Sequence, residues 1–142
     1  CLSRGLGDVY KRQVEAMIRA PFHCDYGYNI SIGKGSYVNF NCVFLDLGPI
    51  RLGQRCLIGP GVQLLTAVHP MNAAERATGK EKGAGIEIGD DCWLGGGVIV
   101  CPGVKIGCRC VIGAGSVVTH DIPDDSVAAG NPARVIRTAT DE

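Results

Sequence analysis

Large apolar residues recur every six positions along this chain, and that period limits the fold more than any other feature. They stand in three runs at Ile32, Val38, Phe44, Leu52, Ile58, Leu64, Ile88, Leu94, Val100, Ile106, Ile112 and Val118. A period of six is neither the 3.6-residue repeat of an amphipathic helix nor the alternation of a half-buried strand. It suits short strands joined by tight turns, with each strand sending one large side chain into a core.

The residues around each large position define the shape of the repeat. Glycine follows directly at positions 33, 53, 59, 89, 95, 107 and 113, and the residue four positions on is small or β-branched. Glycine accepts backbone conformations that strain other residues, and a small side chain fits a corner. The pattern predicts an all-β fold, a parallel β-helix in which three hexapeptides form a triangular coil of about 18 residues and the coils stack.

The repeat also explains two unusual counts in the composition. The chain has 21 glycines and eight cysteines in 142 residues. Four cysteines, at positions 42, 56, 92 and 110, fall on the small-residue position, where a thiol packs as a small apolar group. A zinc site needs paired cysteines or Cys/His clusters, and no second pair matches Cys108 and Cys110. We therefore expect no metal.

Two interruptions of the repeat predict where the coil opens. Phe44 and Leu52 are eight residues apart, which places two inserted residues around 47–49. The second interruption covers residues 69–85, yet the large residues on either side stay 24 positions apart, a multiple of six. This segment is polar and glycine-rich, so we expect a loop extruded from the coil. Long loops in compact domains usually carry function.

Shorter segments flank the repeat. The β-helix domain is predicted over residues 21–137, with a short final strand near residues 135–137, and residues 138–142 form a tail. Residues 14–20 are predicted to be the remnant of an N-terminal helical segment. Residues 1–13 fit no pattern found elsewhere in the chain, and we expect them to be a foreign or artefactual head.

The charge balance argues against two classes of function. The chain carries 14 basic and 14 acidic residues, whereas binding to nucleic acid or to a membrane surface calls for a basic excess. Every apolar stretch falls far short of the ~20 residues that span a bilayer, and no signal-peptide pattern is present. These features predict a cytoplasmic protein with no nucleic-acid or membrane partner.

Several segments between Pro21 and Arg137 resemble one branch of the hexapeptide-repeat acyltransferases. They are residues 24–30 (CDYGYNI), 39–41 (NFN), 66–70 (TAVHP), 88–96 (IGDDCWLGG), 112–119 (IGAGSVVT) and 128–134 (AAGNPAR). Together they are similar to the maltose/galactoside O-acetyltransferase family. The resemblance implies a left-handed parallel β-helix that assembles as a homotrimer, with active sites between subunits. It also implies acetyl-CoA as cosubstrate and a sugar hydroxyl as acceptor.

Direct acetyl transfer from a thioester to a hydroxyl needs a base for the hydroxyl proton, and His69 is the candidate. An imidazole exchanges protons near neutral pH, and general base catalysis contributes about 10²–10⁴ in rate. The Thr-Ala-Val-His-Pro context at the start of the predicted loop favours this role. A carboxylate should orient the imidazole. Glu81, late in the same loop, matches a glutamate of some relatives, although it also fits a solubilising role.

Three residues are candidates for binding the acceptor. By resemblance, Asp25 and Asn39 fall on acceptor-site positions of the family. Asn39 follows an inward residue at a place where glycine is otherwise common. Asp46 lies at the two-residue insertion, and ordinary turn chemistry is the alternative for it and for Asp25. The galactoside branch has a further acidic residue where this chain has Leu47, and this departure argues against a galactoside acceptor.

The resemblance also assigns residues to coenzyme A. They are Trp93, Gly96, Ala114, Thr119, His120, Arg134 and Arg137. The two arginines suit nucleotide phosphates because a guanidinium makes paired hydrogen bonds to them. The glycine run at 95–97 offers backbone N–H groups without side-chain obstruction, although tight coil corners would also explain it. Most relatives carry lysine where this chain has His120.

Other functions remain open at this stage. A xenobiotic or serine acetyltransferase of the same fold differs chiefly in its acceptor. A non-catalytic β-helix fragment would have lost activity, but the retained His69 and the arginine pair argue against it. Carbonic anhydrases of the γ class share the fold and bind zinc through three histidines. Here the histidines stand far apart in the sequence, at positions 23, 69 and 120, and no two have ligand-like spacing.

Overall fold

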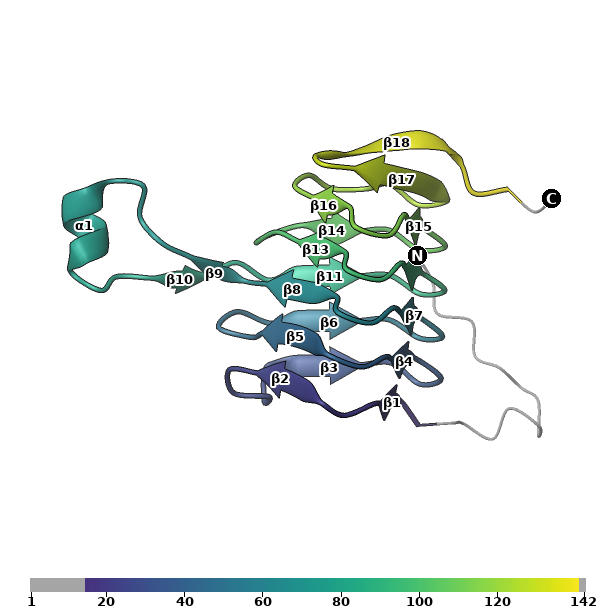
Figure 1. Ribbon diagram of the computed structural model, residues 1–142, viewed down its shortest axis with the longest axis horizontal. Helices are drawn as coiled ribbons and strands as arrows, with labels where there is room; N and C mark the ends of the chain where they lie inside the picture. The colour runs from purple at the N-terminus through teal and green to yellow at the C-terminus, as the bar shows by residue number, and fades with distance from the viewer. Residues whose placement is uncertain (1–14, 141–142) are drawn as a thin grey trace.

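The computed structural model describes residues 15–140 as a stack of three-sided β coils with one projecting loop (Figure 1). Each coil contains short strands separated by turns, and successive coils place equivalent strands side by side in parallel. The predicted β-helix is therefore confirmed. The expectation of a foreign head over residues 1–13 lies outside the described residues.

Strands of successive coils form three sheets, which we call faces A, B and C. Face A contains β1 (Met17–Ile18), β4 (Tyr37–Val38), β7 (Leu57–Ile58), β12 (Trp93–Leu94), β15 (Val111–Ile112), β17 (Ser126–Gly130) and β18 (Ala133–Thr138). Face B contains β2 (Phe22–Cys24), β5 (Cys42–Leu45), β8 (Gln63–Leu65), β13 (Ile99–Val100) and β16 (Val117–Val118). Face C contains β3 (Ile30–Ile32), β6 (Ile50–Leu52), β11 (Ile86–Ile88) and β14 (Lys105–Ile106).

One large side chain per strand points into the coil and builds the core. All the residues of the six-residue period are buried except Ile32, which is half-buried. Equivalent residues such as Val38, Ile58 and Leu94 stand in register on consecutive coils. Burial of each such side chain stabilises the fold by about 1.5–3 kcal/mol. The period of six therefore reports directly on which residues face inward.

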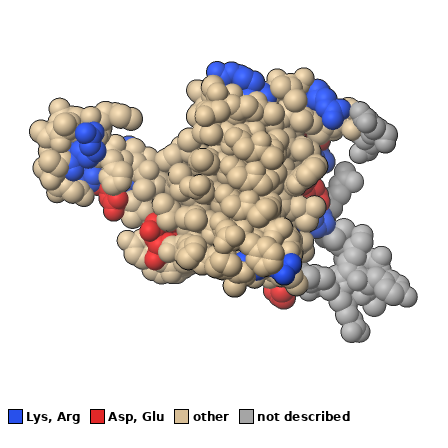
Figure 2. Space-filling view, viewed as in Figure 1, with Lys and Arg blue, Asp and Glu red and all other residues tan. Residues whose placement is uncertain are grey.

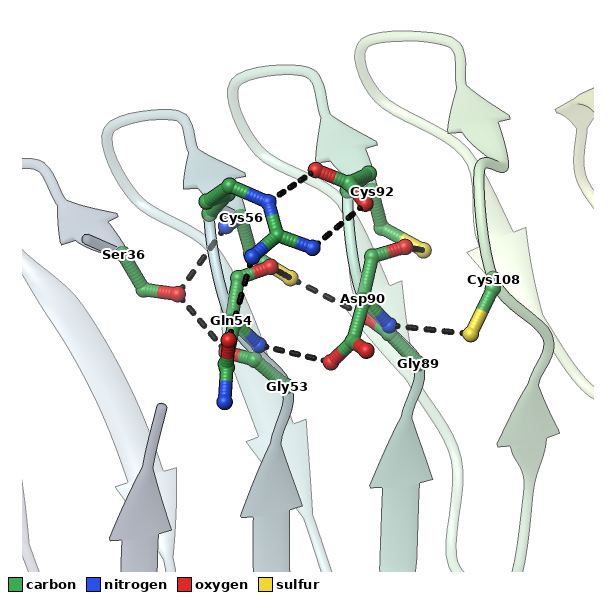
Figure 3. A network of polar contacts seen from close by, with 10 residues as sticks. Ser36, Gly53, Gln54, Cys56, Gly89, Asp90, Cys92 and Cys108 are labelled. Atoms are coloured by element: carbon green, nitrogen blue, oxygen red, sulfur yellow. Dashed lines mark hydrogen bonds and ion pairs between the residues drawn. The ribbon is translucent and has the colours of Figure 1, made fainter. Parts of the chain in front are cut away.

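The corner between faces C and A carries a column of hydroxyl and thiol groups (Figure 3). Ser36, Cys56 and Cys92 occupy the small-residue position of successive coils and are buried. Each donates a hydrogen bond to a backbone carbonyl of the next coil. These bonds run from Ser36 Oγ to Gly53 O (2.7 Å), from Cys56 Sγ to Gly89 O (3.1 Å) and from Cys92 Sγ to Gly107 O (2.9 Å). The predicted burial of the small-position cysteines is confirmed, and their thiols also link coil to coil.

The same corner carries an alternating row of charges, one residue before the column. Arg55 Nε lies 2.7 Å from Asp91 Oδ1, and Arg109 Nε lies 2.6 Å from Asp125 Oδ1. All four residues have φ angles between 53° and 57°, a left-handed conformation that is uncommon outside glycine. The hydrogen bond from Arg109 holds the pKa of the Asp125 carboxyl below its ordinary value. Each ion pair joins two consecutive coils.

The interruption predicted over residues 69–85 is an extruded loop, which projects from the body in Figure 1. It leaves through β9 (Ala67–Val68) and returns through β10 (Lys82–Gly83), which pair antiparallel. Its tip contains the short helix α1 (Ala73–Ala77), which the sequence analysis did not predict. The Asn72 side chain caps this helix by accepting a hydrogen bond from the Glu75 amide over 3.0 Å.

The predicted helical remnant at residues 14–20 is wrong for its described part. Met17 and Ile18 form β1, which pairs in parallel with β4. The Met17 amide donates to the Ser36 carbonyl over 2.9 Å, and the Arg19 amide donates to the Val38 carbonyl over 2.9 Å. The edge of β4 presents a row of backbone groups that need partners, and a strand satisfies them where a helical turn would not.

Within residues 15–140 no helix is long and apolar enough to cross a membrane.

Candidate functional site

An open groove runs along face A, beside the turns that lead from this face to face B. Residues of β4, β7, β12 and β15 and of the turns after them line it. It brings together four predicted site residues, Asn39, Trp93, Gly96 and Ala114. The Trp93 side chain is largely exposed, with 55% of its surface open to solvent. The groove therefore combines aromatic and aliphatic side chains with a set of glycines and an alanine.

The glycine run in this groove is explained mostly by the backbone of the coil. A Cβ on Gly95 would lie 2.6 Å from the Ala114 amide nitrogen, so the close approach of the next coil requires glycine there. Gly97 has a φ angle of +71°, which L side chains rarely adopt. Neither requirement applies to Gly96, where a Cβ would lie 3.4 Å from the Pro60 carbonyl oxygen. Among the three, Gly96 is the one that remains a candidate for ligand contact.

Polar and aromatic groups gather at the end of the groove near β1 and β4. The Asn39 side-chain oxygen accepts a hydrogen bond from the Phe40 amide over 2.8 Å, which leaves its NH₂ group as a donor. The Arg19 guanidinium stacks over the Phe40 ring at 4.1 Å and donates to the Tyr37 hydroxyl over 3.2 Å. Sequence reasoning missed Arg19 and Tyr37. The outward position of Tyr37, two residues before Asn39, was the signal that could have identified it.

The predicted base and its orienter lie side by side at the base of the extruded loop. His69 follows β9 directly and Glu81 precedes β10, so the antiparallel pairing of these strands brings the two residues together. His69 Nε2 lies 3.7 Å from Glu81 Oε2. Both side chains are about half exposed. The carboxylate therefore lies beside one edge of the imidazole, while the ring stays open to a ligand.

Asp46 differs from its expected role as an acceptor ligand. Its side chain is fully buried, and its two carboxylate oxygens accept four backbone N–H bonds of 2.8–3.1 Å from residues 25, 26, 27 and 29. Burial alone would raise the pKa of the Asp46 carboxyl, but these N–H donors lower it below its ordinary value. Asp46 is thus a positioning residue that holds the segment 25–29, while Asp25 on that segment is exposed.

The remaining coenzyme candidates lie near the last coils. Thr119 and His120 follow β16, and the Thr119 hydroxyl lies 2.9 Å from His120 Nδ1. Arg134 and Arg137 belong to β18, which extends face A beyond β15 and β17. Figure 2 shows Lys and Arg side chains along the upper edge of the body, where β18 lies. Arg134 and Arg137 therefore stand on the same sheet as the groove, beyond β15.

Apart from Arg134 and Arg137 on β18, the predicted site residues fall into two groups on one chain. Asn39, Trp93, Gly96 and Ala114 lie at the groove on face A. The second group lies at the turns between faces B and C and comprises Asp25, Asp46, His69, Glu81, Thr119 and His120. The three-sided coil separates these corners, so a single chain does not bring the two groups together.

Across residues 15–140, no three His, Cys, Asp or Glu side chains gather in a way that could hold a metal ion.

Comparisons with known proteins place the chain among enzymes built from the same repeat. The family described as bacterial transferase hexapeptide (six repeats) matches residues 85–120. A hexapeptide-repeat acetyltransferase from Vibrio cholerae O1 biovar eltor, solved in complex with acetyl coenzyme A, superimposes with a TM-score of 0.86 at 41% identity, over 89% of this chain and 69% of that one. The chain belongs to the hexapeptide-repeat acetyltransferase family.

Two further proteins show the same likeness. A maltose O-acetyltransferase from Clostridium difficile 630 superimposes with a TM-score of 0.87 at 47% identity, over 89% of this chain and 68% of that one. Nodulation protein L of Rhizobium meliloti (strain 1021) is 51% identical over 134 residues, which are 94% of this chain and 72% of that protein. The chain spans a smaller share, 65%, of a Schizosaccharomyces pombe relative that is 49% identical. The resemblance drawn from the motifs is confirmed.

Proposed function

We propose that this chain transfers an acetyl group from acetyl-CoA to a hydroxyl of a sugar, with a maltose- or glucose-type acceptor and with His69 as general base. The observation that carries the proposal is the His69–Glu81 pair, 3.7 Å apart, at the mouth of the extruded loop. The Vibrio cholerae relative, which binds acetyl coenzyme A, and the maltose O-acetyltransferase support the donor and the acceptor class.

In this mechanism His69 takes the proton of the attacking hydroxyl. The hydroxyl oxygen forms an ester bond to the acetyl carbon, and the carbon–sulfur bond of the thioester breaks. The proton on the imidazole then passes to the departing thiolate, so that His69 returns to its neutral form. Glu81 stabilises the imidazolium between these two steps because its carboxylate lies beside the ring.

The groove on face A suits a thioester arm. Trp93 offers an apolar wall, and Gly96 and Ala114 leave room for close approach. Arg134 and Arg137, on the same sheet above the groove, would meet the phosphates of the nucleotide, for which guanidinium groups are suited. Thr119 and His120 of a neighbouring copy would contact the arm, from the corner that also carries that copy's His69.

An acetyl-CoA consumption assay over glucose, maltose, galactosides, serine and chloramphenicol tests the proposal. His69→Ala should lower kcat on the best acceptor by about 10²–10⁴. Glu81→Gln should lower kcat by about 10-fold or less and leave the KM for acetyl-CoA unchanged, because it removes a neighbouring charge but not the base. Equal turnover by the native chain and His69→Ala would eliminate His69 as the base. A sharp preference for serine or chloramphenicol would show that the acceptor is that compound and not a sugar.

We further propose that three copies assemble, because the two groups of site residues need a neighbour to meet. Outward side chains on faces A and B are largely apolar, whereas face C is charged. The outward residues are Tyr37, Leu57, Trp93 and Val111 on face A, Val43, Gln63, Ile99 and Val117 on face B, and Ser31, Arg51, Glu87 and Lys105 on face C. Leu57 and Trp93 are exposed and the other apolar residues of these rows are half-buried, and apolar rows left partly open to solvent mark protein contacts. The loop corner of one copy would then face the groove of the next.

A mixing experiment tests this shared site. His69→Ala and Asn39→Ala chains, each of low activity, are unfolded together and refolded as a mixture. If each site takes its loop from one copy and its groove from another, about a quarter of the sites in randomly mixed trimers hold both native halves. Activity should therefore rise to about a quarter of the native value. Activity that stays at the level of the separate variants would show that each chain completes its own site. Light scattering of the native chain should give the mass of a trimer.

A further inference from the structure

An exposed aromatic pair stands beside the acceptor candidate Asp25. The Tyr26 and Tyr28 rings stack on each other, with centroids 5.2 Å apart and an interplanar angle of 29°. Solvent reaches 54% of Tyr26 and 78% of Tyr28. Large aromatic side chains this open to water have no packing reason within the described chain. They instead suit a surface that binds the apolar face of a ligand.

The segment that carries the pair is held rigidly. The buried Asp46 carboxylate accepts the amides of Asp25, Tyr26, Gly27 and Asn29, and the Asn29 side chain donates to the Asp46 carbonyl over 2.8 Å. Five hydrogen bonds thus tie a turn of five residues to the coil below the loop. A ring that is fixed before binding loses little conformational freedom when a ligand arrives. We call this turn, residues 25–29 with the exposed Tyr26 and Tyr28 rings, the platform.

The platform lies on the same corner as the proposed base. Strand β2 precedes the platform, β8 precedes the extruded loop, and β5 lies between them on face B. Rungs of a sheet are about 4.8 Å apart, so the two levels are about 10 Å apart. The inserted residues 47–49 lie between the two levels, and the Gly48 amide donates a hydrogen bond to the Thr66 hydroxyl over 2.8 Å, just before the extruded loop. A second sugar ring linked to the reacting one would span such a distance.

We propose that the Tyr26–Tyr28 pair binds a pyranose ring of the acceptor other than the ring that is acetylated. One face of a pyranose presents C–H groups of partial positive charge, which complement the negative face of an aromatic ring. The Asp25 carboxylate at the edge of the platform accepts hydrogen bonds from the ring hydroxyls. The inference rests on the sugar acetyltransferase function proposed above and narrows its acceptor to a di- or oligosaccharide.

Steady-state kinetics with glucose, maltose and maltotriose tests the platform in the full chain. Tyr28→Ala should raise the KM for maltose and maltotriose about 10-fold, with the KM for glucose and for acetyl-CoA within about 2-fold of native. Tyr28→Phe is the matched control: it keeps the ring, so its KM for maltose should stay within about 2-fold of native. An equal rise for glucose and maltose, or no rise for either, would overturn the platform. Loss of the native mass in light scattering of Tyr28→Ala would overturn it too, by making the pair an assembly contact.

A binding measurement separates this proposal from the proposed reaction. Saturation-transfer NMR with maltose alone, without acetyl-CoA, should detect contact of the sugar C–H protons with the native chain and with His69→Ala, and the signal should be several-fold weaker with Tyr28→Ala at the same maltose concentration. If the native chain binds maltose in this way yet acetylates no sugar, the reaction fails and the platform stands. If the native chain acetylates glucose and maltose while Tyr28→Ala binds maltose as the native chain does, the platform fails and the reaction stands.

Discussion

Replacing Asp46 by asparagine should loosen the turn at residues 25–29 without changing the shape of the side chain. Each carboxylate oxygen accepts two backbone amides, and the side chain is completely buried. Asparagine keeps one oxygen and turns an NH₂ group toward the other two amides. Two buried N–H groups would then face a donor in place of an acceptor.

The size of the loss follows from those two amides. An unsatisfied buried donor costs about 1–3 kcal/mol, and local relaxation recovers part of it. We therefore expect Asp46→Asn to lower the free energy of unfolding by about 2–4 kcal/mol. At about 3 °C per kcal/mol for a chain of this size, the melting temperature should fall by about 6–12 °C. Asp25→Asn, an exposed change on the same turn, should alter stability by less than about 0.5 kcal/mol.

The pH dependence provides a second measurement. Backbone N–H donors hold the pKa of the folded-state carboxyl below its ordinary value, although burial opposes them. The advantage of the native chain over Asp46→Asn is therefore fully present above the unfolded-state pKa of about 3.9, and it shrinks as the pH falls through the lower folded-state pKa. Urea unfolding followed by circular dichroism between pH 7 and pH 2 measures both chains.

Two results would refute this reasoning. Equal urea midpoints for Asp46→Asn and the native chain at pH 7 would mean that the four amide bonds contribute nothing to stability. A stability difference that stays constant down to pH 2 would mean that the charge of the carboxylate is irrelevant.

Two other predictions concern the coil itself. Gly95→Ala should lower the free energy of unfolding by about 2–4 kcal/mol, because its Cβ would meet the Ala114 amide at 2.6 Å, whereas Gly97→Ala, with open space around it, should cost about 1 kcal/mol for its left-handed backbone. Urea midpoints compare the two, and equal losses would contradict the stacking argument. Arg109→Ala should raise the pKa of the Asp125 carboxyl toward its ordinary value, as followed by NMR titration, since Arg109 is what lowers it.

The coil was predictable because it rests on a repeated and local requirement. Each hexapeptide buries one large residue and turns one corner. The spacing alone therefore predicted that Ile58, Leu94 and Ile112 point into the core, where all three are buried. The extruded loop was predictable for the same reason, as a break in that spacing. The helical remnant failed because residues 17–18 take their structure from the edge of β4, a partner some twenty residues away in the chain.

The sequence named the candidate residues, but it did not show how the coil arranges them. The motif around His69 gave the candidate base, and the antiparallel pairing of β9 with β10 places the Glu81 carboxylate beside it. For Asp46 the sequence left acceptor binding and turn chemistry both open, because it does not show that four amides converge on one carboxylate. Nor did the spacing show that Asn39 and His69 stand on different corners, because that depends on where each turn falls in the three-sided coil.

The alternating charges at the corner between faces C and A have a consequence for folding. Coils built from near-identical hexapeptides can pair out of step, since a shift by one coil still buries apolar residues against apolar residues. Arg55, Asp91, Arg109 and Asp125 make such a shift unfavourable. A coil that skipped its neighbour would set Arg55 against Arg109, or Asp91 against Asp125, like charge against like. The row of alternating charges thus favours the native stacking order of the coils over stacking that is shifted by one coil.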